Sequence, residues 1–182
     1  MITRLVITGA PGSGKTMCLE ALKAEPQLSH FIFFDELARR LLVQMPSYRS
    51  NRTEFHREIY HLQTAREQNA GDRPFISDRG TVDAFAFHPE TLFDVGTTLE
   101  REYGRYSAVI HLGSSARLGE TFYHVDSIRT ESMSDALAIE EAIGRAWSGH
   151  PQYEFIEAHP DFGVKLCLCR ERVLSLAGGH SN

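Results

Sequence analysis

The chain has 182 residues, of which 42% are hydrophobic and 24% charged, so it is long enough for one well-buried domain and too short for two comfortable ones. Its formal net charge of −5 and its pI near 6.0 provide no general basic field, which argues against nucleic acid as a partner. No apolar run approaches the roughly 20 residues that a membrane span needs. We also expect no signal peptide, because Met1 leads directly into a short strand pattern.

The hydrophobic pattern alternates between strand and helix periods along the chain. In chain order it predicts a strand at 2–8, a helix at about 14–23, a strand at 30–34, a helix within 35–45, a helix through Phe55, Ile59 and Leu62, strands at 74–77 and 106–112, a helix through Ile139, Ile143 and Trp147, a strand at 154–158, and a helix at about 166–176. Short apolar strands separated by helices imply a parallel sheet covered on both faces. We therefore expect an α/β fold with a five-stranded, mainly parallel sheet, in a single domain over residues 1–182.

The three cysteines, Cys18, Cys167 and Cys169, form neither an even disulfide framework nor a CxxC pair. They lie among apolar residues, so we expect reduced, buried thiols in a cytoplasmic protein. Nine histidines are scattered without the spacing of metal ligands, and we expect no dedicated histidine metal site.

The first strand leads into GAPGSGKT, which matches G-x-x-x-x-G-K-[ST] between a strand and a helix. The motif consists of Gly9, Ala10, Pro11, Gly12, Ser13, Gly14, Lys15 and Thr16. Its glycines allow successive backbone N–H groups to face one anion, and the helix N-terminus adds partial positive charge. We expect Lys15 to reach the β and γ phosphates of a nucleoside triphosphate, and the Thr16 hydroxyl to ligate Mg²⁺. The alternative is a glycine-rich turn with a solvated lysine.

A P-loop of this kind is shared by GTPases, motor ATPases and kinases. The chain contains no Asn-Lys-x-Asp motif for recognition of the guanine base, which argues against the small GTPases. In PFISDRG, Asp78 ends the third strand, where a carboxylate would meet the metal through water, and Arg79 would point to phosphate or to an acceptor carboxylate. The alternative is a helix cap by Asp78, with Arg79 paired on the surface.

The segments GAPGSGKT, DELARRLL, ISDRGTVDAFAF, YHVDSIRTES and CRERV follow one another along nearly the whole chain. With this set the sequence resembles the AAA-domain family of NadR-type ATPases, which includes the ribosylnicotinamide kinase domain of NadR, and more distantly the nucleoside and nucleotide kinases. The resemblance implies a P-loop NTPase fold, a three-layer α/β/α sandwich with a lid segment.

The E-x-x-R of that family falls on Glu36 and Arg39, which the resemblance implies are substrate-binding residues together with Arg79. Glu36, or its neighbour Asp35, would orient an acceptor hydroxyl or take its proton. The position agrees, because open α/β sheets bind ligands beyond the carboxyl ends of their strands. The alternative is that both acids simply begin a helix, where they suit its dipole.

The polar stretch Gly113–Thr130 has the composition of a lid and follows the fourth strand. The family's D-x-x-R falls on Asp126 and Arg129, and the resemblance implies that Arg129 neutralises charge on the transferring phosphoryl group. It also implies that Arg170 lies where related kinases cover the adenine. Arg129 could instead be a solvated loop arginine.

Two functions remain open. One is an enzyme that transfers the γ-phosphoryl of ATP, with GTP possible, to a small nucleoside-like or other hydroxyl acceptor with Mg²⁺. The other is a nucleotide-regulated ATPase, GTPase or binding protein in which nucleotide occupancy moves the lid. We favour the kinase because acidic and basic residues are expected to converge opposite the P-loop.

Overall fold

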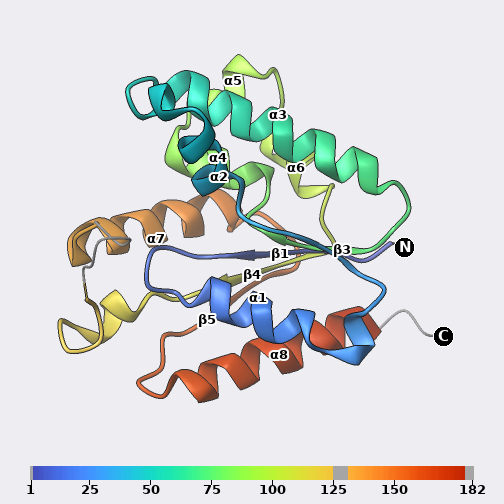
Figure 1. The fold of residues 1–182 in the computed structure, drawn as a ribbon, viewed down its shortest axis with the longest axis vertical. Helices are drawn as coiled ribbons and strands as arrows, with labels where there is room; N and C mark the ends of the chain where they lie inside the picture. The colour runs from blue at the N-terminus through green and yellow to red at the C-terminus, as the bar shows by residue number, and fades with distance from the viewer. Residues whose placement is uncertain (1, 125–130, 179–182) are drawn as a thin grey trace.

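The computed structural model describes residues 2–124 and 131–178, which form one sheet between two layers of helices (Figure 1). The strands are β1 (Arg4–Thr8), β2 (Ile32–Phe34), β3 (Phe75–Asp78), β4 (Ala108–Leu112) and β5 (Tyr153–Ile156). The α-helices are α1 (Lys15–Lys23), α2 (Leu37–Gln44), α3 (Arg52–Ala70), α4 (Thr81–Phe87), α5 (Thr91–Asp94), α6 (Leu99–Tyr103), α7 (Met133–Trp147) and α8 (Phe162–Gly178). Three short 3₁₀ helices are η1 (Pro26–Leu28), η2 (Pro46–Arg49) and η3 (Ser115–Leu118).

All strand pairs are parallel, in the order β2-β3-β1-β4-β5. The three-layer α/β/α sandwich and its five-stranded sheet are therefore confirmed. The register sets Ile7 beside Asp78 and Thr8 beside His111, so β1, β3 and β4 end at the same edge of the sheet. At this edge the connection from β1 runs to β2 on one side of β1, whereas the connection from β3 crosses to β4 on the other side; open α/β sheets form their ligand crevice where the direction reverses in this way.

The central strand β1 divides the core into two halves because its side chains alternate between the two faces. Leu5 and Ile7 pack in the cluster that includes residues of α1 and α8, whereas Val6 packs in the cluster that includes Trp147 of α7. Figure 1 shows α1 and α8 on one face of the sheet and α3, α4 and α7 on the other. Both faces of the sheet are thus covered, which explains why the strands carry apolar side chains on both faces.

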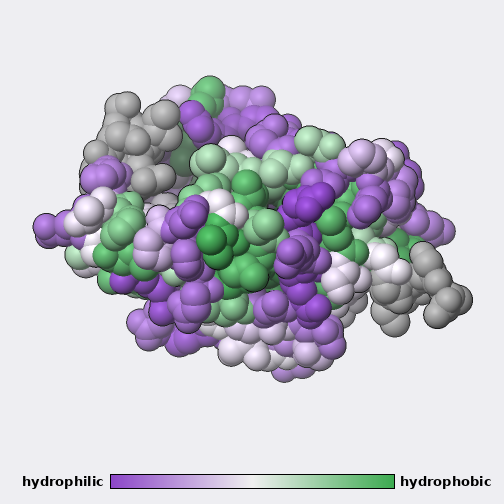
Figure 2. Space-filling view, turned by 90° about the horizontal axis from the view of Figure 1, so that it is seen from below, coloured by the Kyte–Doolittle hydropathy of each residue, from purple (hydrophilic) through white to green (hydrophobic). Residues whose placement is uncertain are grey.

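The outer surface of α1 and α8 is partly apolar. Figure 2 looks onto this side of the molecule and shows hydrophobic surface near its centre, bordered by polar residues. Met17 of α1 and Val164 and Leu168 of α8 are exposed. All three cysteines are free; Cys18 and Cys169 are buried as expected, but Cys167 is exposed, because residues two positions apart on α8 do not share a face of the helix.

The region between β3 and β4 contains α4, α5 and α6, for which the apolar periodicity gave no expectation. A buried polar network joins this region to α3. Glu67 accepts hydrogen bonds from Arg105 Nη2 at 2.6 Å and from the Tyr106 hydroxyl at 2.8 Å, and the Tyr60 hydroxyl donates to Glu102 at 2.9 Å. Burying charged groups requires such pairing, and here it fixes α3 against the segment that leads into β4.

None of the helices in the described part of the chain is long and apolar enough to cross a membrane.

Candidate active site

The loop between β1 and α1 curls around the start of the helix, as the sequence motif predicted. Gly12 and Gly14 have φ angles of 78° and 81°, a left-handed conformation that side chains with a Cβ rarely adopt. A Cβ on Gly12 would also approach the Tyr123 ring to 2.9 Å. The N–H groups of Gly12 and Gly14 have no hydrogen-bond acceptor among the described residues. These amides, at the positive end of α1, are available to an anion.

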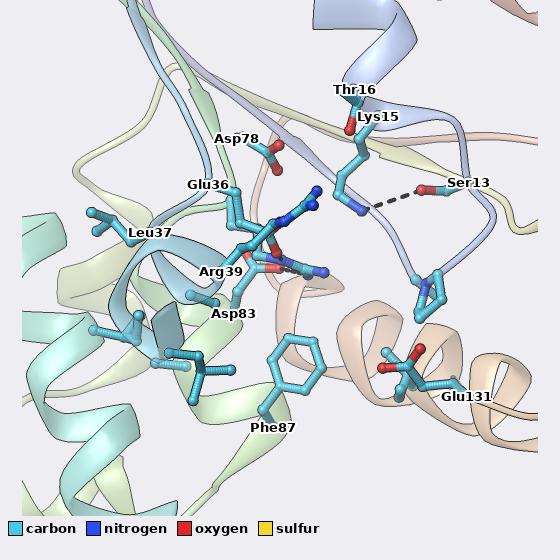
Figure 3. Close-up of a pocket in the computed structure, with 18 of the residues that line it drawn as sticks. Ser13, Lys15, Thr16, Glu36, Leu37, Arg39, Asp78, Asp83, Phe87 and Glu131 are labelled. Carbon is cyan, nitrogen blue, oxygen red and sulfur yellow. Dashed lines mark hydrogen bonds and ion pairs between the residues drawn. The ribbon is translucent and has the colours of Figure 1, made fainter. Parts of the chain in front are cut away.

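Lys15 lies at the first position of α1 and lines the cavity. Its ammonium donates to the Gly9 carbonyl at 2.7 Å and to Ser13 Oγ at 3.3 Å (Figure 3). Burial, together with the positive charge of Arg79, lowers the pKa of Lys15 from 10.5 to about 8. A phosphate placed beside this ammonium would favour its charged form.

Asp78 is the last residue of β3, and in Figure 3 it lies on the side of Lys15 opposite Ser13. It is only 6% exposed, and its Oδ1 has no hydrogen-bond partner in the part of the chain that the structure describes. Burial raises the pKa of Asp78 from 3.8 to about 6, against the opposing effect of Lys15 and Arg79. A buried carboxylate oxygen without a partner fits a site for a hydrated cation. Thr16 lines the same cavity, so the expected pair of Mg²⁺ residues lies on one surface.

Arg79 follows Asp78 and adopts a φ of 67°, a conformation that non-glycine residues rarely use. Its side chain turns into the cavity, where Nε lies 3.4 Å from Glu36 Oε1 and Nη1 lies 3.3 Å from Asp83 Oδ1. The guanidinium carbon lies 4.9 Å from the centre of the Phe87 ring. The unfavourable backbone conformation thus places a cation between two carboxylates.

Asp83 is a site residue that the sequence reasoning missed. Its Oδ2 accepts from the Gly80 N–H at 2.8 Å and from Trp147 Nε1 at 3.2 Å, and its Oδ1 accepts from the Thr8 hydroxyl. It therefore fixes Arg79 relative to the end of β1. The sequence does carry a signal, because an acid at the third position of a helix commonly caps the backbone N–H that precedes the helix.

Glu36 precedes α2 and is half-exposed. Burial raises the pKa of Glu36, but the charges of Arg79 and Lys15 outweigh that effect, and the resulting pKa is below its ordinary value. Arg39, one turn further along α2, acts in the same direction. Glu36 is therefore a carboxylate at neutral pH. Figure 3 shows it on the side of the cavity opposite Ser13 and Lys15.

The cavity between these residues has a volume of about 870 Å³ and is lined by the P-loop, α2, α3, β3 and α4. This volume lies within the range of about 300–1,000 Å³ that is usual for small-molecule sites. Beyond the charged groups, Leu42, Phe55, Ile59 and Phe87 form an apolar wall. The arrangement has a polar, cationic end for phosphates and a wider apolar end for another group.

Two of the expected ligand-binding residues lie apart from this cavity. Asp35 is 78% exposed in its side chain and pairs with Lys23 at 2.8 Å. Arg170 pairs with Glu25, with Nη2 2.9 Å from Oε2. Neither lines the cavity, so their proposed contacts with acceptor and adenine stay predictions. Arg129 and Asp126 lie outside the described residues.

The expected lid begins as a packed segment. Ser114 and Tyr123 are buried, the Ser115 N–H donates to the Gly12 carbonyl at 3.1 Å, and the Ser114 hydroxyl donates to the Pro11 carbonyl. Ser114, Ser115 and Tyr123 therefore pack against the P-loop, whereas 125–130 lie outside the described residues. Apolar and small side chains within the polar stretch explain this packing. The lid over Gly113–Thr130 stays a prediction.

The model of a family described as AAA domain matches residues 4–162. Three solved structures of deoxyadenosine kinase from M. mycoides are similar in fold. The one with products dCMP and a flexible dCDP has 11% identity and a TM-score of 0.66, and covers 95% of this chain and 100% of that chain. The one with dCTP has 13% identity, a TM-score of 0.60 and the same coverage. The one with dATP has 11% identity, a TM-score of 0.61 and coverage of 94% and 99%. No curated protein sequence matches the chain. Because the family match spans most of its length, the chain belongs to the AAA-domain family.

Proposed function

We propose that the protein is a P-loop kinase that transfers the γ-phosphoryl group of ATP to a hydroxyl group of a small, nucleoside-like acceptor. The observation that carries the proposal is the placement of Glu36 in the same cavity as Lys15 and Asp78. A carboxylate opposite the phosphate site is what transfer to a hydroxyl requires, whereas bare hydrolysis needs only a positioned water.

The chain's residues divide into three roles in this proposal. The P-loop amides and Lys15 hold the β and γ phosphates. Thr16 and Asp78 would hold Mg²⁺, which would neutralise charge on the phosphate oxygens. Glu36 accepts the proton of the acceptor hydroxyl, and it is ionised for this purpose at neutral pH.

Arg79 positions Glu36, the proposed base, and does not itself accept the proton. Its guanidinium contacts Glu36 and Asp83 at the same time, so it fixes the carboxylate relative to α4. Positioned groups of this kind contribute to the rate because little reorganisation is needed at the moment of transfer.

The acceptor end of the cavity supports a flat, partly apolar ligand. Phe55, Ile59 and Phe87 provide apolar surface, and Arg39 and Arg49 line the same cavity. A nucleoside combines an aromatic base with sugar hydroxyls and suits this combination. The similar structures are those of a deoxyadenosine kinase, with nucleotides bound. The narrower NadR-type assignment, ATP rather than GTP, and a cytoplasmic location stay predictions.

Acceptor-dependent release of ADP tests the proposal. The purified protein is incubated with MgATP or MgGTP and a panel of nucleosides and other hydroxyl compounds, and the products are identified by mass spectrometry. We expect at least one acceptor to raise ADP release above bare hydrolysis and to appear as its monophosphate.

Two variants serve as controls in the same assay. Lys15→Met should abolish both reactions, and Glu36→Gln should abolish only the acceptor-dependent part. Hydrolysis that no acceptor stimulates, with nucleotide-dependent binding of another protein, would instead support the nucleotide-regulated switch.

A further inference from the structure

A buried lysine lies on the outer side of the P-loop and belongs to α8. Lys165 is 3% exposed, and its ammonium donates to the Ser13 carbonyl at 2.6 Å and to the Gly113 carbonyl. It forms no ion pair with a carboxylate in the described residues. Lysine is almost never fully buried without a charged partner, because desolvating an ammonium is costly. Its location between two backbone carbonyls therefore calls for a role that an apolar residue could not fill.

The P-loop is held from its outer side at three successive carbonyl groups. The Ser114 hydroxyl donates to the carbonyl of Pro11, the Ser115 N–H donates to that of Gly12, and Lys165 donates to that of Ser13. In a trans peptide the carbonyl and the N–H point in opposite directions. Fixing the Pro11 and Ser13 carbonyls outward therefore directs the Gly12 and Gly14 amides inward, whereas the Ser13 N–H donates to the Ala10 carbonyl at 3.2 Å.

The contact of Lys165 bears directly on the Gly14 amide. The Ser13 carbonyl and the Gly14 N–H belong to the same peptide unit, and this N–H has no acceptor among the described residues. A cation on the carbonyl polarises the peptide and makes its N–H a stronger donor. The same ammonium also adds positive charge behind the N-terminus of α1, where an anion would bind.

Lys165 also connects the P-loop to the segment after β4. Its second acceptor, the Gly113 carbonyl, shares a peptide unit with the Ser114 N–H, which donates to the buried carboxylate of Glu140 on α7. Glu140 in turn pairs with Arg117. One ammonium thus links α8, the P-loop and the start of the segment that packs on it. The family match ends at Phe162, before this residue.

We propose that Lys165 is a positioning residue of the phosphate site, which holds the Ser13 carbonyl outward so that the Gly14 amide faces the phosphates of a bound nucleotide. The proposal rests on the part of the proposed function that assigns a nucleoside triphosphate to the P-loop, and it does not depend on the acceptor. Lys165 does not touch the substrate; it acts through the Ser13–Gly14 peptide.

Three substitutions separate the hydrogen bond from the charge. Lys165→Met removes both, Lys165→Gln retains a donor without charge, and Lys165→Arg retains both. Lys23→Met is the matched control, because Lys23 is a lysine of α1 whose ammonium pairs with Glu20 and Asp35 at the surface. Equilibrium binding of ATP and, in a separate titration, of adenosine, a nucleoside without phosphates, is measured by calorimetry.

We expect Lys165→Met to weaken ATP binding by roughly 10- to 100-fold, the size expected for a hydrogen bond that involves a charged group. Lys165→Gln should be intermediate, and Lys165→Arg and Lys23→Met should remain within about threefold of wild type. Adenosine binding should not change, because it has no phosphates. In ¹H–¹⁵N spectra the Gly14 and Ser114 amides should shift in Lys165→Met, while amides of α3 stay in place.

Several results would overturn the proposal. Wild-type ATP affinity in folded Lys165→Met or Lys165→Gln contradicts it, and so does an equal loss of ATP and adenosine affinity, which indicates a purely structural role. If Lys165→Met does not fold, Lys165→Gln decides by the same criterion, with Lys165→Arg as the reference that should keep wild-type affinity. A wild-type protein that binds ATP but phosphorylates no acceptor refutes the kinase function alone. One that binds no triphosphate refutes both.

Discussion

Replacing Asp78 by Asn should stabilise the nucleotide-free protein at neutral pH and at the same time impair its binding of Mg²⁺-nucleotide. The carboxylate is nearly buried, and its Oδ1 has no hydrogen-bond partner in the described part of the chain. Burial raises its pKa from 3.8 to about 6. Asparagine has nearly the same shape and cannot ionise, so the substitution removes the buried charge without leaving a cavity.

The size of the effect follows from the pKa of Asp78. Because that pKa is higher in the folded protein, the folded state binds a proton between about pH 4 and pH 6 that the unfolded state does not, and stability falls as the pH rises through this window. At 1.36 kcal/mol per pH unit, the difference between 3.8 and about 6 corresponds to about 3 kcal/mol. Above about pH 6 the carboxyl group is ionised in both states, and the stability of the folded protein falls no further on this account. The free energy of unfolding of Asp78→Asn should therefore exceed that of wild type by up to about 3 kcal/mol at neutral pH, and by much less near pH 4.

Urea denaturation in the presence of EDTA and without nucleotide measures this difference, at about pH 5 and about pH 7.5, on either side of the folded-state pKa. Asp72→Asn is the control, because it makes the same chemical change at an exposed aspartate between α3 and β3. A titration with Mg²⁺ at fixed ATP should show that Asp78→Asn needs more Mg²⁺ than wild type. If Asp78→Asn is no more stable than wild type at about pH 7.5, the argument from the unpaired buried charge is wrong.

Three further predictions concern the transfer reaction. The pKa of Lys15 is about 8 in the free protein, so ATP affinity should fall up to about tenfold per pH unit above pH 8, and calorimetry should find no such dependence in Lys15→Met. Glu36→Gln should change the Kd for ATP by less than about threefold and lower kcat for the acceptor by at least about 10²-fold; equal losses of both would contradict its role as base. Arg129→Ala should lower kcat by at least about 10²-fold at nearly constant nucleotide Kd, and full kcat would make Arg129 a surface residue.

The sheet and the P-loop could be predicted from the sequence because both are local patterns. Each strand is a short, mainly apolar run, and all five were expected within a few residues of their observed limits. The P-loop requires glycines at fixed spacing before a helix, so GAPGSGKT identifies it without tertiary information. The exposed Cys167 shows the limit of such reasoning, since apolar neighbours in sequence do not reveal which side of α8 faces the core.

The other site residues are defined by contacts between distant parts of the chain. The hydrogen bond of Thr8 to Asp83 spans 75 positions, and that of Lys165 to Ser13 spans 152. No periodicity connects residues at such separations. The helices after β3 were also missed, because buried polar residues such as Glu102 of α6 interrupt the apolar pattern there, as Glu67 does in α3. Pairing with Arg105 makes these positions possible, and only the folded structure shows the partner.

The free site holds two groups of opposite sign whose charged forms are both disfavoured. Burial lowers the pKa of Lys15 to about 8 and raises that of Asp78 to about 6. Phosphates would favour the ammonium, and Mg²⁺ would favour the carboxylate, so each ligand removes a different part of the desolvation cost. ATP without Mg²⁺ would instead bring negative charge toward Asp78. Mg²⁺ and ATP should therefore bind cooperatively, and because such coupling is reciprocal, each should raise the affinity for the other by the same factor.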